Sequence, residues 1–300
     1  MINFSIRTAR RQALATAVMG ALCGLISPGA FATGGERAAA SPAAQDSAPG
    51  ALRLCALSNS LPYSAREGAR GFDVAVAEAL AQRLGKTLEI TWTDNGEGRL
   101  QEIDESDYPL RRLAKNECDL LLSMPGPARD TLKEAPALAL GQPYYGAAFE
   151  LIGPPGTSGQ LKALRTKPVA IQAQTVASFA IAILQGKQRT FFSAQEALDG
   201  VTSGEADAAL LWGPAAGWAL KQSPSSTLAI AEGYEPPAAL AWNLHAATRG
   251  KDEALRVEVD LALGELARDG QLASIAAAWG IPLHAPFATT YSLTEINKLR

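Results

Sequence analysis

The side chains of this chain that could do chemistry are mostly aromatic, amide and hydroxyl groups, because the common catalytic motifs are missing. The sequence has no Gly-x-Ser-x-Gly elbow, no phosphate-binding loop, no paired-histidine metal helix and no Cys-x-x-Cys pair. The two histidines stand alone, His245 in an apolar segment and His284 in a proline-rich tail, and a structural role is favoured for both. These absences predict a binding protein without a cofactor or metal rather than an enzyme.

Candidate ligand-binding side chains follow the ends of the expected strands, where ligands bind in parallel α/β sheets. Trp212 closes an apolar run within 204–214 that predicts a strand buried on both faces. Thr175 is placed to cap a helix, and the free N–H groups of that helix would suit an anionic ligand group. Packing in the core stays an open alternative for Trp212 and for Tyr144 or Tyr145. The candidate set is Asn59, Tyr63, Met124, Tyr144, Gln174, Thr175 and Trp212.

The elements that would position these side chains alternate between strands and helices, which is typical of a parallel α/β sheet. The first helix is predicted to have Asp73 as its N-cap and Gly85 after its end. The acidic segment 94–107 lacks periodicity and is predicted to be an exposed loop. Strands are predicted at 52–57, 88–92, 118–124, 169–172, 204–214 and 228–230, and helices at 73–84, 110–114, 177–184, 194–202, 215–221, 252–268 and 272–279.

Two extended apolar segments, 147–152 and 239–246, carry no helix of their own and bracket one complete α/β unit. We interpret them as crossings between two lobes, with lobe 1 at 51–147 plus 246–300 and lobe 2 at 151–241. The expected fold is therefore α/β with two lobes, each a mostly parallel sheet flanked by helices, joined by two crossing hinge strands. Loops from both lobes would face one cleft and bind a small ligand by hinge closure.

The first residues predict export. Residues 1–32 combine three arginines, an apolar stretch and a small-x-small site at 30–32, the features of a cleavable signal peptide. The segment 33–50, rich in Ala, Ser, Pro and Gly, is predicted to be a flexible tether. Removal of the leader leaves Cys55 and Cys118 in an oxidising compartment, and this even count favours a disulfide, with two small buried thiols as the alternative.

The composition and net charge of the chain indicate which classes of partner it can bind. A chain of 300 residues that is 47% hydrophobic and 19% charged has enough material for two cores. The net charge of -3 and the lack of a basic stripe argue against nucleic acid.

Several short motifs occur in an order and spacing that resemble the periplasmic solute-binding proteins of family 3, the amino-acid-binding type. This resemblance implies a type II periplasmic binding protein fold, a small-molecule ligand, a monomer, and an ABC permease as partner. The matching stretches are Leu61-Pro62-Tyr63, Gly71-Phe72-Asp73, Cys118-Asp119-Leu120-Leu121 with Met124, Pro143-Tyr144-Tyr145, Ala206-Asp207-Ala208 and Asp269-Gly270-x-Leu272-x-x-Ile275.

Departures from the family pattern argue against ordinary amino-acid transport. The family holds a ligand carboxylate with an Arg in a Thr-x-x-Arg turn, but the turn here is Pro127-Ala128-Arg129-Asp130, so the Thr is missing and Arg129 is displaced. The family holds the ammonium with an Asp, and the equivalent position here is Trp212. A zwitterion with unpaired charges in a desolvated cleft would lose several kcal/mol. Arg129 is kept as a candidate ligand-binding residue.

One branch of the family departs from the family pattern in a similar way. The MoxJ and XoxJ proteins, periplasmic companions of PQQ-dependent (quinoprotein) alcohol dehydrogenases, resemble this chain in Cys55, in Cys118-Asp119, and in the segment from Gly204 to Gly217. The basic, aromatic segment of that branch is replaced here by the acidic segment 94–107. The resemblance therefore leaves a quinoprotein dehydrogenase accessory and an amino-acid-binding component of an ABC transporter as alternatives.

A dehydratase-like enzyme on the same scaffold is a third alternative, because some family members resemble binding proteins yet catalyse dehydration with cleft carboxylates. A buried Asp or Glu with a raised pKa in the cleft would favour that enzyme. An open, aromatic and uncharged cleft would favour the accessory.

Overall fold

The computed structural model describes residues 50–68, 70–94, 108–126 and 137–299, which belong to one compact unit. The predicted signal peptide at 1–32, nearly all of the tether and of the acidic segment, and the candidate Arg129 lie outside the described residues. The sequence predictions for these parts stay predictions. Within the part described, no helix is long and apolar enough to cross a membrane.

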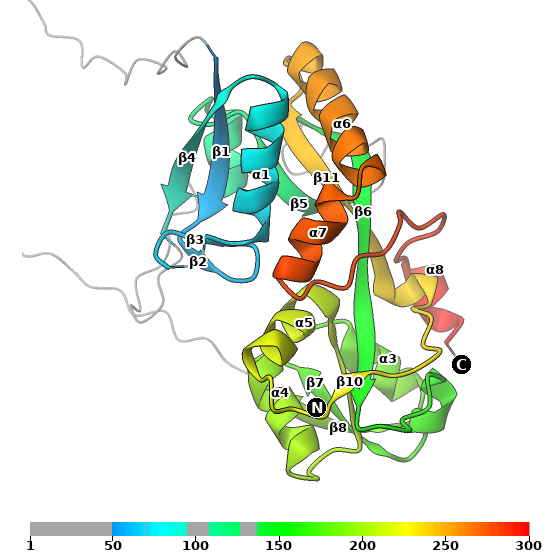
Figure 1. Cartoon of the computed structure of the whole chain (residues 1–300). Helices are drawn as coiled ribbons and strands as arrows, with labels where there is room; N and C mark the ends of the chain where they lie inside the picture. Colours follow the sequence, from blue (N-terminus) through cyan, green and yellow to red (C-terminus); the bar gives the residue numbers. More distant parts are fainter. Residues whose placement is uncertain (1–49, 69, 95–107, 127–136, 300) are drawn as a thin grey trace, which may run out of the picture. The chain divides into compact units, whose positions relative to one another are not determined.

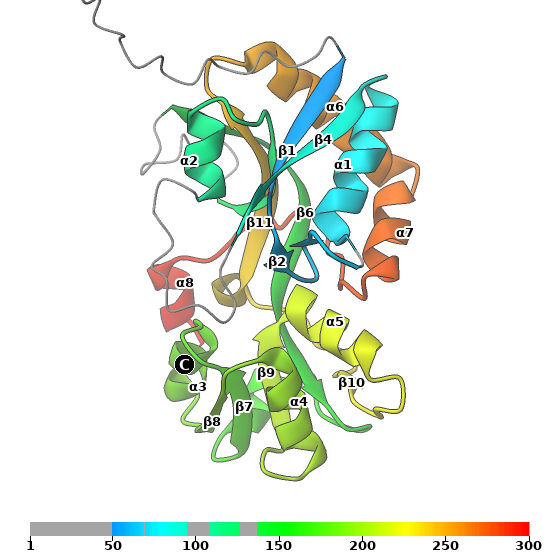
Figure 2. The same cartoon turned by 90° about the vertical axis from the view of Figure 1, so that its left-hand side faces the viewer.

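The first α/β unit pairs two parallel strands, β1 (Ala51–Leu57) and β4 (Thr87–Thr93), connected by α1 (Phe72–Arg83) (Figure 2). The predicted apolar stripe of α1 packs inward: Phe72, Val76 and Leu80 are completely buried. A small antiparallel hairpin follows β1, a detail that the sequence had indicated only as a loop. The hairpin strands are β2 (Asn59–Ser60) and β3 (Ser64–Ala65).

The start of α1 corrects one prediction, because Asp73 is not its N-cap. The cap is Gly71, with φ 105°. A Cβ at this position would lie 2.3 Å from the carbonyl oxygen of Tyr63, so the close approach of the two backbones requires glycine. Asp73 lies instead within the first turn, and its buried side chain accepts a hydrogen bond of 2.5 Å from the Ser123 hydroxyl.

The predicted disulfide between Cys55 and Cys118 is confirmed, with their Cα atoms 5.6 Å apart. The chain leading into β5 (Leu121–Pro125) runs parallel to β1, and the Cys55 N–H donates to the carbonyl oxygen of Leu120 over 2.8 Å. The first strand and the segment that follows Cys118 are therefore parallel neighbours. Beside the disulfide, Arg53 and Arg249 approach Asp119 Oδ1 at 2.8 and 2.9 Å, a buried ion cluster.

Two long strands, β6 (Leu138–Gly153) and β11 (Ala241–Arg249), contain the predicted crossing segments. β6, the long green strand of Figure 1, pairs antiparallel with β11 along one part of its length and with β9 (Ala208–Trp212) along the other. Among the described residues, the largest sheet has the order β5-β11-β6-β9-β7-β8, and β10 (Ala229–Ile230) pairs with the end of β6.

The second α/β unit is built around β9 and β7 (Pro168–Gln172), which are parallel neighbours. Val169, Ile171 and Leu210 are completely or almost completely buried, as their apolar runs predicted. β8 (Lys187–Phe191) pairs parallel with β7 at the sheet edge and was not predicted. The remaining elements between β6 and β10 are η2 (Leu161–Leu164), α3 (Ala177–Ile183), α4 (Ala194–Thr202) and α5 (Gly213–Gln222). Helix α2 (Pro109–Ala114) belongs to the first unit and precedes β5.

The C-terminal region returns to the first unit and then leaves it. Helices α6 (Glu253–Arg268) and α7 (Gln271–Ala278) pack against α1, whereas α8 (Leu293–Asn297) contacts α3 and η3 (Ala238–Leu240). The end of the chain therefore lies beside elements of the range 151–241, although the sequence analysis placed all of 246–300 in lobe 1. α8 itself was not predicted.

Apolar side chains gather in separate cores on the two sides of the crossing strands. One core joins β1, α1, β5, α6 and α7, and it includes Leu52, Leu80, Leu263 and Ile281. A second core gathers side chains from 149 to 240, with Trp212 and Trp242 packed against both. The arrangement agrees with the expected α/β fold, in which two crossing strands join two sheet units.

Candidate functional site

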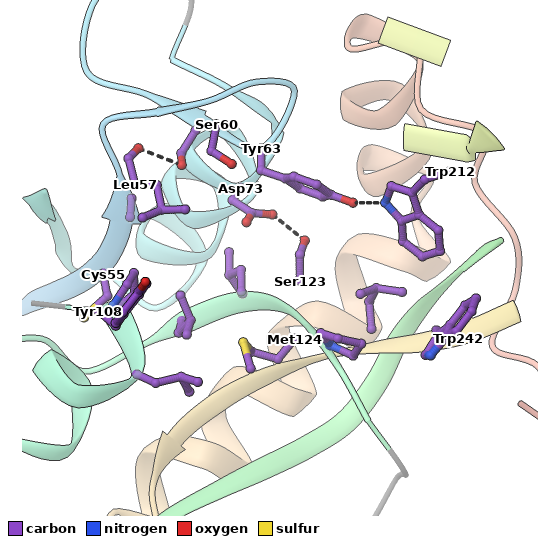
Figure 3. Close-up of a pocket in the computed structure, with 18 of the residues that line it drawn as sticks. Cys55, Leu57, Ser60, Tyr63, Asp73, Tyr108, Ser123, Met124, Trp212 and Trp242 are labelled. Atoms are coloured by element: carbon purple, nitrogen blue, oxygen red, sulfur yellow. Dashed lines mark hydrogen bonds between the residues drawn. The ribbon is translucent and has the colours of Figure 1, made fainter. Parts of the chain in front are cut away.

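A pocket of about 620 Å³ lies where the two α/β units meet the crossing strands (Figure 3). This volume is in the range typical of small-molecule sites. Phe149 of β6 and Trp242 of β11 come from the crossing strands, so residues of both crossings form part of the wall. The described lining residues are Cys55, Ala56, Leu57, Ser60, Tyr63, Ser64, Asp73, Tyr108, Pro109, Leu110, Leu121, Leu122, Ser123, Met124, Pro125, Phe149, Thr175, Val176, Trp212, Trp242 and Leu244.

A polar cluster centred on Ser123 forms one side of this pocket. The Ser123 hydroxyl donates to Asp73 Oδ1 over 2.5 Å and lies 2.9 Å from the Tyr145 hydroxyl. Its backbone N–H donates to the Tyr144 hydroxyl over 3.1 Å. Ser123 has φ 52°, a left-handed conformation that is uncommon for a serine in a strand. Strained backbone of this kind often occurs at functional sites.

Burial changes the acidity of the groups in this cluster. It raises the pKa of Asp73 from 3.8 to about 7, and the hydrogen bond from Ser123 offsets only part of this effect. Burial also raises the pKa of Tyr63, Tyr144 and Tyr145, so these phenols stay neutral at ordinary pH. Asp73 is therefore the group in this cluster that changes charge near neutral pH.

Aromatic rings form another part of the pocket wall. The indole N–H of Trp212 donates to the Tyr63 hydroxyl over 2.8 Å, and Figure 3 shows the two side chains pointing toward each other. The rings of Phe149, Trp212 and Trp242 contact one another with centroids 5.6 to 5.9 Å apart. Trp242 is supported from behind by Tyr291, whose ring stacks on it at 5.0 Å.

The described pocket lining carries charge of one sign only. Asp73 is its single acidic residue, and no Lys, Arg or His belongs to the part of the lining that the structure describes. The described residues also contain no cluster of His, Cys, Asp and Glu that could hold a metal ion.

Solved structures with the same architecture are periplasmic binding proteins and their relatives. MxaJ from Methlophaga aminisulfidivorans is 23% identical, and the alignment covers 77% of this chain and 99% of that one with a TM-score of 0.58. The L-cystine solute receptor of Neisseria gonorrhoeae, in its unliganded open conformation, is 15% identical over 77% of this chain and 92% of that one, with a TM-score of 0.63. The chain has the type II periplasmic binding protein fold.

An ancestral cationic amino acid solute binding protein shares this fold, with 22% identity over 77% of this chain and 96% of the other and a TM-score of 0.58. No protein-family model matches the sequence, and no curated protein matches it either. Identities of this size establish the periplasmic binding fold but not the ligand.

Within this fold, some of the predicted site residues line the pocket and others do not. Tyr63, Met124, Thr175 and Trp212 line the pocket. Tyr144 is buried behind the lining and reaches it through Ser123. Asn59 and Gln174 are exposed and are not among the lining residues, and Arg129 lies outside the described residues. Ligand contact by any of these residues stays a prediction.

Thr175 does not have the capping role that the sequence analysis gave it. The N-cap of α3 is Val176, without a side-chain cap. The Thr175 hydroxyl donates instead to the carbonyl oxygen of Gln172 over 2.8 Å, a local turn that competes with capping. The suggested anion site at this helix therefore has no support.

Sequence analysis missed four central residues of the pocket. Asp73 was assigned to a helix cap, although a carboxylate within an otherwise apolar, buried stripe is itself a signal of a buried polar partner. Phe149 and Trp242 lie on segments that were recognised as crossings, and their aromatic side chains there were the available signal. Ser123 carries no local signal, because its role depends on residues far away in sequence.

Neither histidine lines the pocket, in agreement with structural roles. The two ring nitrogens of His245 lie 2.9 and 2.8 Å from the carbonyl oxygens of Gly141 and Gly126. His284 Nε2 lies 2.7 Å from Oε1 of the buried Glu150 on β6. Both histidines thus fasten the crossing strands to neighbouring segments.

Proposed function

We propose that this protein is a periplasmic solute-binding protein of the family 3 type that captures a small ligand in the aromatic pocket. The proposal rests on one observation: side chains from both α/β units and from both crossing strands form the pocket wall. A ligand in contact with all of these parts stabilises whichever arrangement of them encloses it. The likeness to solute receptors supports the same function.

The lobe boundaries deduced from sequence belong to this proposal. Lobe 1 comprises 51–147 plus 246–300, lobe 2 comprises 151–241, and the hinge lies around Phe149 and Asn243. Within the C-terminal part of lobe 1, α8 contacts α3 and η3 of lobe 2. The separate cores on either side of the crossing strands support these limits. Tyr63 of one lobe and Trp212 of the other are already joined by the 2.8 Å hydrogen bond, a contact that links the two lobes across the pocket.

Tryptophan fluorescence offers a direct test of ligand capture. Trp212 and Trp242 line the pocket, whereas Trp218 packs against Trp279 and is not a lining residue. Titration with a library of small metabolites should change the emission and raise the melting temperature, and small-angle scattering should show compaction. Trp212→Phe should reduce the emission change, while the control Trp218→Phe should preserve it. A protein whose melting temperature responds to no small molecule in the library is not a solute-binding protein.

A second candidate is an accessory of a quinoprotein alcohol dehydrogenase. It is favoured by the Gly204–Gly217 segment, which resembles the MoxJ and XoxJ branch, and by the fold shared with MxaJ. Affinity purification with a quinoprotein dehydrogenase of the same cells tests it. Co-elution that Trp212→Ala abolishes supports the accessory role, and absence of co-elution with the unaltered protein excludes it.

A dehydratase-like enzyme is also favoured by one observation, the buried Asp73 with a pKa raised to about 7, which matches a general acid or base near neutral pH. Each ligand found in the screen should then be incubated with the protein and analysed for loss of water by mass spectrometry. Turnover that Asp73→Asn removes without loss of binding identifies an enzyme, and unchanged ligands identify a binding protein.

A further inference from the structure

We propose that the pocket selects an organic cation with an apolar, ring-bearing body and no carboxylate, held between Asp73 and the aromatic wall. This inference rests on the proposed function and names the ligand class of the same pocket. Three features of the described residues lead to it: the single charge of the lining, a free carboxylate oxygen, and the arrangement of the rings.

Asp73 is buried, with 9% of its surface exposed, and it belongs to the pocket lining. Its Oδ1 accepts the hydrogen bond from Ser123, while Oδ2 has no hydrogen-bond partner in the described part of the chain. A buried carboxylate without a cation beside it is unfavourable, so a positively charged ligand group would supply what the protein lacks. The carboxylate thus provides a specific contact for an ammonium group.

Aromatic rings form part of the remaining wall, beside aliphatic side chains. Phe149, Trp212 and Trp242 meet edge to face or at an incline, so their faces point in different directions around the pocket. Such faces attract organic cations through the negative charge above each ring, and they also pack well against apolar groups. Tyr63 adds a further ring and is fixed by its bond from the Trp212 indole.

The same lining disfavours ligand carboxylates. An anion or a zwitterion would place its carboxylate in a pocket whose described lining offers Asp73 and no base. Where the family pattern places an ammonium-binding Asp, this chain has Trp212, and its lining carboxylate comes from α1 instead. The site therefore keeps a contact for an ammonium group but lacks, in its described part, the contact for a carboxylate.

Cation binding should be linked to proton release. The titratable groups that face Asp73 are Tyr63, Tyr144 and Tyr145, from the β3 region and from β6, and all three are neutral phenols at ordinary pH. A bound ammonium favours the ionised carboxylate, whereas a protonated Asp73 offers no charge. Affinity for a cation should therefore fall as the pH drops below about 7, by roughly tenfold per pH unit at the limit.

Calorimetry with four matched probes tests the inference: phenethylamine, phenethyl alcohol, hydrocinnamate and phenylalanine. They share a phenyl ring and differ in bearing an ammonium, no charge, a carboxylate, or both. The amine is expected to bind at least roughly tenfold more tightly than the other three at pH 8, and to lose this advantage at pH 5. Asp73→Asn should remove the preference for the amine while retaining the alcohol, and the control Asp199→Asn, an exposed acid on α4, should change neither.

The outcomes separate this inference from the function on which it rests. Binding of phenylalanine or of the alcohol as tightly as the amine keeps the solute-binding function and overturns the cation preference. Equal amine affinity in Asp73→Asn also overturns it. If none of the four probes produces heat, the pocket does not take ring-bearing cations, and the metabolite screen alone then decides whether the protein binds solutes.

Discussion

Replacement of Asp73 by Asn should stabilise the protein at alkaline pH. Burial raises the pKa of Asp73 from 3.8 to about 7, so the folded state binds the proton more tightly than the unfolded state does. The contribution of Asp73 to the free energy of unfolding is therefore highest below pH 3.8 and decreases as the pH rises toward 7. Asn is neutral at every pH, and its amide oxygen can still accept the hydrogen bond from Ser123.

The size of the effect follows from the shift in pKa. Each pH unit between the two pKa values contributes about 1.4 kcal/mol, so the unaltered protein should lose roughly 3 kcal/mol between pH 5 and pH 8 through Asp73 alone. Urea unfolding of both proteins at several pH values gives the difference between their unfolding free energies. Other titrating groups are common to both proteins and cancel in that difference.

Relative to the protonated carboxyl, which the amide resembles, the difference should favour Asp73→Asn by roughly 2 kcal/mol at pH 5 and by roughly 4 kcal/mol at pH 8. Two proteins whose unfolding free energies change in parallel over this range would refute the assignment of a strongly raised pKa to Asp73. A destabilised variant at all pH values would mean that the carboxyl group makes contacts that an amide cannot replace.

Three further predictions concern stability. Thiol titration of the unreduced protein should detect neither Cys55 nor Cys118, and two free thiols would contradict the disulfide. Joint replacement of both cysteines by Ala should lower the free energy of unfolding by roughly 4 kcal/mol, because the disulfide closes a loop with a sequence separation of 63 residues. Hydrogen bonds from Arg53 and Arg249 outweigh the burial of Asp119 and lower its pKa. Asp119→Asn removes the carboxylate that pairs with the buried Arg53, whereas Arg249 keeps its ion pair with Asp252, and the variant should cost about 3 to 5 kcal/mol in urea unfolding at pH 7. A loss within experimental error would show that water compensates the Arg53 guanidinium. Gly217→Ala should lower the melting temperature by several degrees, because the new Cβ would clash with the carbonyl oxygen of Gly280. The control Gly264→Ala, at an open helical position, should leave the melting temperature unchanged or raise it. Equal effects of the two substitutions would contradict this packing.

The buried elements were predictable because their sequences are apolar in the period of a strand or a helix. The run ending at Trp212 became β9, and the stripes of α1, α6 and α7 face the core. The exposed strand β8 was missed, because its sequence, Lys-Gln-Arg-Thr-Phe, has the charge of a protected sheet edge rather than an apolar period. The short α8 was missed because five residues give too little periodicity.

The pocket was predictable in position but only partly in composition. Tyr63, Met124 and Trp212, which the sequence places at strand ends, belong to the described pocket lining, and their contact with a ligand stays a prediction. The polar cluster was not predictable, because the contact between Asp73 and Ser123 joins residues separated by 50 positions and exists only after the sheet has formed. A local rule assigned Asp73 to the helix end, and tertiary packing gave it a different role.

The composition of the two cores has a consequence for the order of folding. The core beside α1 needs Leu52 near the start of the chain and Ile281 near its end, whereas the other core is drawn mainly from the continuous stretch between Phe149 and Leu240. In a chain that emerges N-terminus first, the stretch between Phe149 and Leu240 exists before the last members of the core beside α1, from Val259 to Ile281. The N-terminal half therefore stays without a finished interior until α6 and α7 have been made, because its contacts require the closure of very long loops. Until then the N-terminal half lacks the apolar side chains of α6 and α7 that complete its core.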